Sequence, residues 1–265
     1  MSEAVYTVGT VLRIGAIASN VFREVIRDRI LYLIGLYAGA LMLAGRLLPE
    51  VAAATEKKIL LDLAFAAMPV LGLIAAIFIG TGLVNKEIEK RTVFVLIAKP
   101  VSRAEFILGK HLGLSAVLAV LIAAMMVIAI AILFALKVPF SLQNLLISSG
   151  FLFLQLSLVS AIAILFSVFT SALLAMLLTF GVFLMGQLSQ DLVKFGRLTK
   201  NSSIEAFTQG LYLVLPDLAR LDLKNQAVYN LIPAPSVLLG SALYAALYIT
   251  FTLAIASLIF SQREF

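Results

Sequence analysis

Residues 112–136 form the sequence LGLSAVLAVLIAAMMVIAIAILFAL, an apolar stretch without a single charged side chain. About 20 apolar residues in a helix span the ~30 Å hydrocarbon layer of a bilayer. A helix is favoured there because it pairs its own backbone N–H and C=O groups, for which lipid offers no partner. A membrane β-barrel would instead show alternating hydrophobicity over ~10-residue segments. The stretch therefore predicts an α-helix that crosses a membrane.

The whole chain has the composition of a membrane protein. Its 265 residues are 62% hydrophobic and 13% charged, with a mean hydropathy of +1.10, whereas soluble domains average about 45–50% apolar and about 25% charged residues. Further candidate spans lie at residues 30–48, 63–84, 145–169, 172–188 and 237–260. We therefore predict an all-α polytopic membrane protein with six transmembrane helices, organised as one domain over residues 1–265.

The division between the fourth and fifth spans depends on a short polar cluster. No charged residue lies between Val138 and Gln190, a distance longer than one crossing needs. Ser167, Thr170 and Ser171 form the best turn in this stretch. Two crossings that meet at this turn are the simpler interpretation, and a re-entrant pair of helices is the alternative.

Residues 7–29 predict an amphipathic helix that lies at the membrane surface before the first span. Apolar residues recur there at helical spacing, and the polar residues fall mostly on the opposite face. The apolar set is Val8, Val11, Leu12, Ala18, Val21, Phe22, Val25 and Ile26, and the polar set is Arg13, Asn20, Arg23, Glu24 and Arg27. A soluble helix packed on another protein is the alternative.

The distribution of basic residues predicts that both termini are cytoplasmic, because Lys and Arg concentrate in cytoplasmic loops. With the N-terminus inside, more than half of the 20 Lys and Arg fall in cytoplasmic segments: Arg13, Arg23, Arg27, Arg29, Lys86, Lys90, Arg91, Lys99, Arg103, Lys110 and Arg263. The short outer segments hold only Arg46, Lys57, Lys58 and Lys137. Residues 189–235 are then extracytoplasmic, and residues 236–265 hold the last span and a cytoplasmic tail.

Several kinds of catalytic or cofactor site are excluded by the residues that the chain lacks. There is no cysteine, and His111 is the only histidine, so neither H-E-x-x-H nor a Ser–His–Asp triad is possible. A phosphate-binding loop is missing, because Gly109-Lys110 is followed by His111. We expect no cofactor in this chain and an interfacial His111 without a special role. The net charge of +6 belongs to membrane loops, so we expect no nucleic-acid partner.

The predicted spans hold almost no ionisable residue, whereas ion-coupled transporters place such residues in mid-membrane. Arg46 lies at the outer end of its span, where it can extend its charge to the headgroups. Gln155 is the most polar side chain in mid-span. It either forms a hydrogen bond between helices or contacts a substrate in a transport pathway.

The cytoplasmic loop at residues 85–110 has the sequence NKEIEKRTVFVLIAKPVSRAEFILGK. Its charged first part and apolar Val93–Ala98 predict a short amphipathic helix, which Pro100 ends because a proline disfavours helix at the residue before it. Ser102 and Glu105 match a capping box that starts the third span. These features favour a shaped docking surface over an ordinary charged loop.

This loop resembles the one after the second span in ABC type-2 permeases. The shared pattern is E-x-x-K-R-T followed by L-x-x-K-P-V-S-R-x-E-F-x-L-G-K, which is most similar to permeases that mature multicopper enzymes of the nitrous-oxide-reductase type. Many relatives have Gly-Thr in place of Arg91-Thr92. The N-terminal helix, the six spans, the long outer segment and the short tail agree with this family.

The resemblance implies an ATP-driven transporter of exporter or maturation type in the bacterial plasma membrane. Two permease copies pair, as a homodimer or a heterodimer, and each docks on a separate ATP-binding subunit that holds ATP and Mg²⁺. The candidate coupling residues are Glu87, Glu89, Lys90, Arg91 and Thr92. Ser167, Thr170 and Ser171 would form a smaller cytoplasmic contact.

Two other functions are compatible with the sequence, and so are several conformations of one segment. The chain could be a stand-alone carrier or channel, which the lack of intramembrane charges disfavours. It could also be a membrane scaffold or assembly factor that holds a partner through the same loop. In the outer segment, Phe207–Leu218 either dips into the membrane, caps the pathway or forms a plain outer helix.

Overall fold

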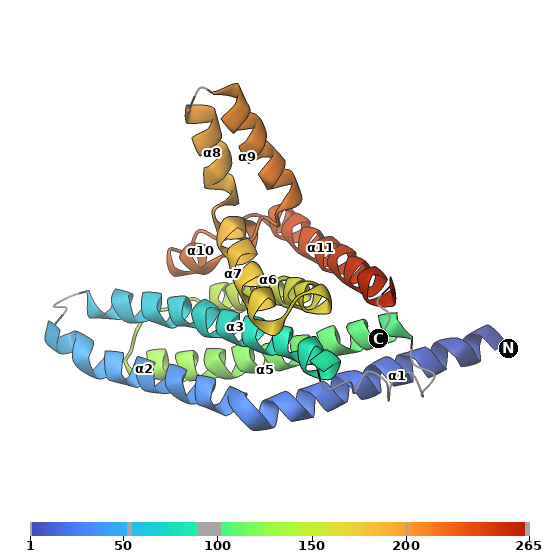
Figure 1. The fold of residues 1–265 in the computed structure, drawn as a ribbon. Coiled ribbons are helices and arrows are strands. Elements are labelled where there is room, and N and C mark those ends of the chain that lie inside the picture. The colour runs from blue at the N-terminus through green and yellow to red at the C-terminus, as the bar shows by residue number, and fades with distance from the viewer. Residues whose placement is uncertain (1, 52–54, 90–101, 200, 263–265) are drawn as a thin grey trace.

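The fold is described from a computed structural model, which covers residues 2–51, 55–89, 102–199 and 201–262, without the side chains of 2–8, 28, 29, 51, 88 and 89. Every regular element in these ranges is a helix (Figure 1). In chain order they are α1 (Ser2–Val25), η1 (Ile26–Ile30), α2 (Leu31–Val51), α3 (Glu56–Glu89), α5 (Arg103–Ala135), α6 (Leu142–Phe169), α7 (Ala172–Gln187), α8 (Ser189–Leu198), α9 (Ser202–Val214), η2 (Ala219–Leu221), α10 (Lys224–Val228) and α11 (Pro235–Gln262).

Within the described ranges, five helices are long and apolar enough to cross a membrane: α2, α3, α5, α6 and α11. A sixth crossing is possible if α7 and α8, which bend by 59° at Leu188, form one broken span. The expected fifth span corresponds to α7, and Thr170 and Ser171 separate it from α6 as predicted. The structure therefore supports five or six spans, with the short α7 as the open case.

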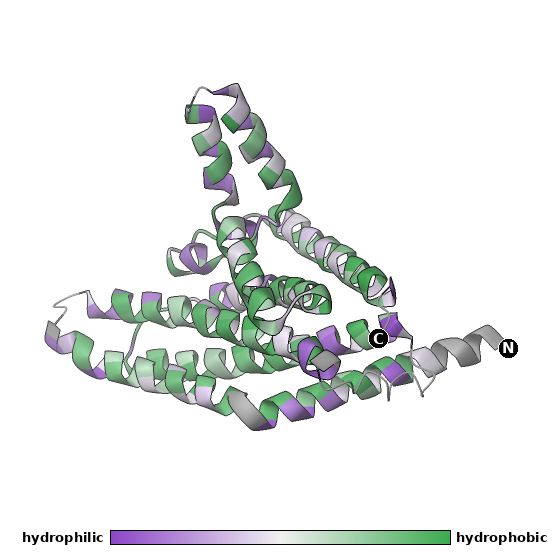
Figure 2. Cartoon of the chain, viewed as in Figure 1, coloured by the Kyte–Doolittle hydropathy of each residue, from purple (hydrophilic) through white to green (hydrophobic). Residues whose placement is uncertain are grey.

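Helix α6 lies at the centre of the bundle, between α3, α5 and α11. In the most apolar 18-residue stretch of α6, 72% of the residues are buried, whereas in that of α2 the share is 11%. The core between α5 and α6 contains fully buried side chains such as Leu114, Leu121 and Leu156. Figure 2 shows that apolar residues also cover the outer surfaces of the long helices. An exposed apolar surface of this extent suits contact with lipid.

Helices α1 and α2 form one long bent rod, joined by the π-helical turn η1 (Figure 1). The rod runs along α5. Two glycines of α5, four residues apart, allow α1 to pack closely against it. A Cβ on Gly113 would lie 2.7 Å from the carbonyl oxygen of Ala18, and one on Gly109 would lie 2.7 Å from Cβ of Ile17. Small residues at this spacing are common where two membrane helices approach closely.

The predicted amphipathic helix at 7–29 is thus a helix that packs on the bundle with part of its apolar face. Val21 and Val25 are buried against α5 and its neighbours, whereas Val11 and Leu12 are exposed. Its position relative to a membrane surface stays a prediction.

Residues 189–235, which the sequence predicts to be extracytoplasmic, begin with the α8–α9 hairpin. The segment that follows, residues 215–234, is called the strap. Helices α8 and α9 pack against each other and stand away from the bundle (Figure 1). The chain then returns, and Leu218, Leu221 and Leu223 are buried in the main core. Of the predicted Phe207–Leu218 segment, residues 207–214 belong to α9 and are mostly exposed, apart from the buried Thr208, whereas Pro216, Asp217 and Leu218 are buried.

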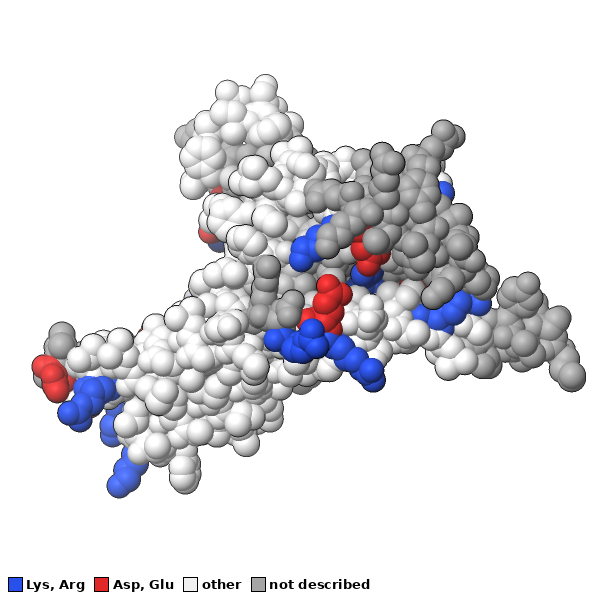
Figure 3. Space-filling model, turned by 60° about the horizontal axis from the view of Figure 1, so that its bottom comes forward, with Lys and Arg blue, Asp and Glu red and all other residues white. Residues whose placement is uncertain are grey.

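Charged side chains collect away from the middle of the long helices. Figure 3 shows one group at the α2–α3 turn and a second toward the ends of α1 and α3, with a broad uncharged surface between them. This separation fits two headgroup layers on either side of a hydrocarbon region.

Candidate functional site

The start of α5 has the capping box that the sequence predicts. The Ser102 hydroxyl accepts a hydrogen bond from the Glu105 backbone N–H at 3.1 Å. The Glu105 carboxylate in turn accepts one from the Ser102 backbone N–H at 2.8 Å. These two bonds satisfy backbone donors that a helix start otherwise leaves unpaired. The start of α5 is therefore fixed at Ser102.

Glu105 also connects α5 to α1. Its Oε1 lies 2.7 Å from Nη2 of Arg13, and its Oε2 lies 3.1 Å from Nε of the same guanidinium. The Arg103 guanidinium donates to the carbonyl oxygens of Phe260 and Ser261 at the end of α11. Helices α1, α5 and α11 therefore meet at one end of the bundle, which brings both ends of the described chain to the same side.

A second ion pair connects the end of α3 to α5. The Lys110 ammonium pairs with the Glu87 carboxylate, and it also lies 5.4 Å from the centroid of the Phe106 ring. The Lys110 side chain is almost completely buried. An unpaired charge in such a place is strongly unfavourable, and Glu87, in the last turn of α3, compensates the charge of Lys110.

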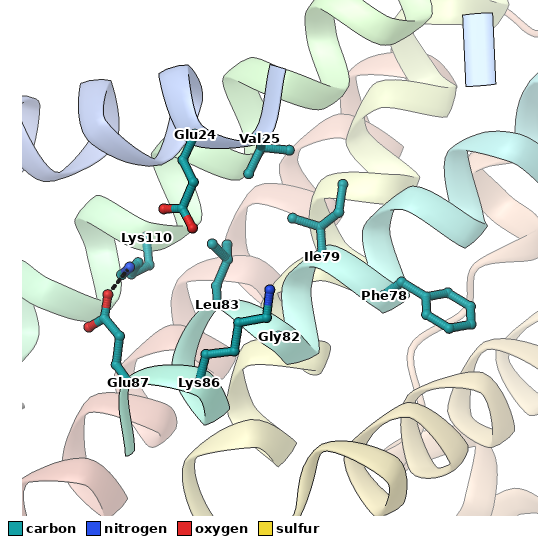
Figure 4. Close-up of a pocket in the computed structure, with 9 residues that line it drawn as sticks. All are labelled: Glu24, Val25, Phe78, Ile79, Gly82, Leu83, Lys86, Glu87 and Lys110. Atoms are coloured by element: carbon teal, nitrogen blue, oxygen red, sulfur yellow. Dashed lines mark hydrogen bonds and ion pairs between the residues drawn. The ribbon is translucent and has the colours of Figure 1, made fainter. Parts of the chain in front are cut away.

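A small pocket lies beside this ion pair, between α1, α3 and α5. Figure 4 shows Glu24 of α1 and Lys86 of α3 on its two sides, with the Glu87–Lys110 pair at one edge. Its volume is about 80 Å³, well below the roughly 300–1,000 Å³ of ligand pockets. The pocket is a small gap between packed helices.

The remaining predicted coupling residues lie at or beyond the end of α3. Glu89 is the last residue of α3, and its side chain is outside the described part. Lys90, Arg91 and Thr92 also lie outside the described residues. Of the predicted set, the structure places Glu87 alone, and places it inward toward Lys110.

The predicted second cytoplasmic contact lies close to the same end. The hydroxyl of Ser167 donates to the carbonyl oxygen of Thr81 on α3 at 3.1 Å, and Ser167 is completely buried. Thr170 is partly exposed and Ser171 is exposed, at the turn between α6 and α7. Ser167 therefore holds the turn against α3, and only Thr170 and Ser171 can meet a partner.

His111 is enclosed by protein, which the sequence did not indicate. Its two ring nitrogens lie 3.3–3.4 Å from the hydroxyls of Ser115, Ser157 and Ser160. Ser115 follows it by one helical turn, and the other two come from α6. The cluster is a polar contact between α5 and α6, one residue after Lys110 in sequence.

Gln155 forms a hydrogen bond between helix and strap. Its Nε2 donates to the backbone carbonyl oxygen of Leu218 at 3.2 Å, and the side chain is buried. The sequence predicted either an interhelical hydrogen bond or a contact with substrate. In the structure Gln155 bonds to the segment that follows α9, and a contact with substrate stays a prediction.

Asp217 is a buried residue with hydrogen bonds to several elements, and it was not predicted as a functional residue. Its carboxylate accepts hydrogen bonds from Ser189 and Gln190 at 3.1 Å each. Its backbone N–H donates to the Tyr244 hydroxyl on α11 at 2.8 Å. Asp217 thereby connects the α7–α8 bend, the strap and α11. The dipeptide Pro216-Asp217 was the only signal, and it predicts a turn without predicting these partners.

Among the residues that the structure describes, no group of three or more His, Cys, Asp or Glu side chains could hold a metal ion. The described polar groups instead connect helices to one another at the two ends of the bundle.

Comparison with known families places the chain. The model of a family described as ABC-2 family transporter protein matches residues 15–264, nearly the whole sequence. No curated protein matches the chain.

Proposed function

The chain belongs to the ABC-2 family of transporter proteins, and from that membership we propose that it couples to separate ATPase subunits through the loop at residues 85–110. It is a membrane permease component of an ABC transporter. ATP and Mg²⁺ are held by the partner, and this chain supplies the moving helices without catalysing hydrolysis.

The observation that carries this proposal is the anchoring of the loop at both of its ends. At the first end Glu87 pairs with Lys110 of α5. At the second end Glu105 caps α5 and pairs with Arg13 of α1. Hydrogen bonds between charged groups are stronger than neutral ones. A displacement of the loop by an ATPase is therefore passed to α1, α3 and α5 together.

The α6–α7 turn supports a second, smaller contact with the same partner. Ser167 fixes this turn to α3 through Thr81, so Thr170 and Ser171 stand near the start of the loop. Together the loop and the turn form a cytoplasmic docking face in this proposal. Both termini are cytoplasmic in it, and the membrane is the bacterial plasma membrane.

Two copies of the permease form the transport pathway in this proposal, because one chain has only five or six candidate spans. The loop pattern favours the branch that matures multicopper enzymes, and transport in that branch is of exporter or maturation type. Gln155 belongs to the strap contact, so it acts on a pathway by holding Leu218 in place.

The test is charge reversal at Lys90 and Arg91, the two basic residues of the proposed coupling set. The double variant Lys90→Glu/Arg91→Glu places like charges against a docking groove, which costs several kcal/mol at mispaired interfaces. We expect a stable, membrane-inserted permease that no longer retains or stimulates a co-expressed cassette ATPase. The matched control is Lys194→Glu/Arg197→Glu on α8, which should retain the ATPase.

Retention and full ATP turnover in the loop variant would contradict the coupling role. A scaffold would bind the ATPase without stimulating it. If the wild-type permease co-purifies with the ATPase but the ATPase hydrolyses ATP no faster than it does alone, the scaffold function is favoured.

A further inference from the structure

A pocket lies at the opposite end of the bundle from the loop at residues 85–110. It is lined by the start of α3, the α5–α6 turn and α10, and its volume is about 680 Å³. This size falls within the roughly 300–1,000 Å³ of small-molecule sites. Its lining residues, which define the lysine pocket, are Lys57, Lys58, Leu61, Phe65, Val138, Pro139, Phe140, Ser141, Ala227, Val228, Tyr229 and Asn230.

The lysine pocket is cationic at one end and apolar along its wall. Lys57 and Lys58 are exposed in the first turn of α3. Leu61 and Phe65 follow one and two helical turns later on the same face, and both are buried in the bundle. One face of α3 thus leads from two positive charges at the end of the bundle to an apolar surface within it.

Within the described part of the chain, neither Lys57 nor Lys58 forms an ion pair with a carboxylate. Glu56 and Asp62 lie on the same helix, yet the ion pairs of the described residues involve neither them nor the two lysines. The Lys58 ammonium instead lies 4.5 Å from the centroid of the Tyr229 ring, which is a cation–π contact with α10. This contact holds a positive charge at the pocket without cancelling it.

We propose that the lysine pocket binds an anionic amphiphile. Its charged head, such as a phosphate, contacts Lys57 and Lys58, and its alkyl chain lies against Leu61 and Phe65. Lys groups near a membrane surface attract anionic lipid heads by about 1 kcal/mol each, and the buried apolar wall favours an alkyl chain. Binding at this place requires no ATPase, so the inference goes beyond the coupling function.

The experiment measures lipid binding to the full-length chain in neutral detergent, by native mass spectrometry. The probes are phosphatidylglycerol and phosphatidylcholine with identical acyl chains, and inorganic phosphate serves as a competitor. We expect phosphatidylglycerol to bind more tightly than phosphatidylcholine. The variant Lys57→Gln/Lys58→Gln should weaken phosphatidylglycerol binding by about 30-fold, which corresponds to two charges at about 1 kcal/mol each.

The control Lys194→Gln/Arg197→Gln removes two positive charges from the exposed helix α8 and should bind both lipids like the wild type. Equal phosphatidylglycerol binding by the lysine-pocket variant and the wild type would overturn the proposal. So would a wild type that does not distinguish the two lipids. Displacement of phosphatidylglycerol by equimolar inorganic phosphate would show that the site takes an anion alone and that the alkyl chain is not recognised. No ATPase is present in the measurement, so its failure leaves the coupling proposal untouched.

Discussion

Arg13 of α1 and Glu105 of α5 form a two-pronged ion pair across 92 positions of sequence, with Nη2 2.7 Å from Oε1. The Glu105 side chain is 7% exposed and that of Arg13 is 33% exposed. The same carboxylate caps its own helix through the Ser102 backbone N–H. One side chain therefore sets where α5 begins and where α1 lies against it.

Replacement of Arg13 by Ala should lower the stability of the folded permease by about 1–3 kcal/mol, because it leaves a buried, hydrogen-bonded carboxylate without its charged donor. Glu105→Ala should cost more, since it also removes the cap, a loss of about 1 kcal/mol. Thermal unfolding in detergent measures both. The control Lys194→Ala breaks a pair that is exposed on both sides and should change stability by less than about 0.5 kcal/mol. Equal effects at Arg13 and Lys194 would contradict a structural role for the pair.

Gly113→Ala should push α1 away from α5. A Cβ at this position would lie 2.7 Å from both the Ala18 carbonyl oxygen and the Val21 Cβ, and backbone atoms cannot move aside as a flexible side chain can. We expect a lower unfolding temperature and faster hydrogen exchange in α1. The control Gly240→Ala has nothing within 4 Å of the new Cβ and should be neutral or stabilising, since Ala is favoured over Gly in helices by about 1 kcal/mol. A neutral Gly113→Ala would show that the two helices are not in close contact.

Asp217→Ala should release the strap and the α8–α9 hairpin from the bundle. The substitution removes the acceptor for Ser189 and Gln190. Ser189 keeps a hydrogen bond to the Gly186 carbonyl oxygen and Gln190 is exposed, so we expect each lost bond to cost about 0.5–1.5 kcal/mol. Hydrogen exchange should rise at the α7–α8 bend and in the strap, and stay unchanged in α5. Asp191→Ala, at an exposed position on α8, is the matched control. Unchanged exchange in the strap of the Asp217 variant would mean that other contacts hold it.

A reporter fused after Phe265 should behave as cytoplasmic, and one inserted near Asn201 as external. Asn201 lies at the tip of the α8–α9 hairpin, and the end of α11 lies beside α1 and α5 at the other end of the structure (Figure 1). This outcome requires that α7 and α8 together cross the membrane once. Both reporters on the same side of the membrane would show that the pair is re-entrant.

Local features were predictable because they depend on residues that are close in sequence. The capping box at Ser102 and Glu105 formed as expected, since its two bonds join residues three positions apart. The turn at Thr170 and Ser171 ended one helix and began another, because these residues interrupt a long apolar run. The apolar stretch at 112–136 lies within α5 for almost its whole length.

The candidate site was only partly predictable. Glu87 was predicted to lie in the loop after the second span, whereas α3 continues to Glu89. Its partner Lys110 lies 23 positions away on another helix. Ser167 was predicted to face a partner protein, and its hydroxyl instead bonds to Thr81. In both cases the side chain could satisfy its hydrogen bonds in several ways, and helix packing selected one of them.

The sequence by itself determined that this protein is helical and membrane-spanning, because apolar length and backbone pairing in lipid leave no other solution. It also determined the start of α5 and the ends of α6 and α7 to within a few residues. Only the tertiary structure decided that α1 packs on Gly109 and Gly113, that His111 and Gln155 are enclosed, and that Asp217 joins three elements. The physical reason is that spans of similar hydropathy can be arranged in many ways. The close approach of small residues and the pairing of a few buried polar groups then select one arrangement.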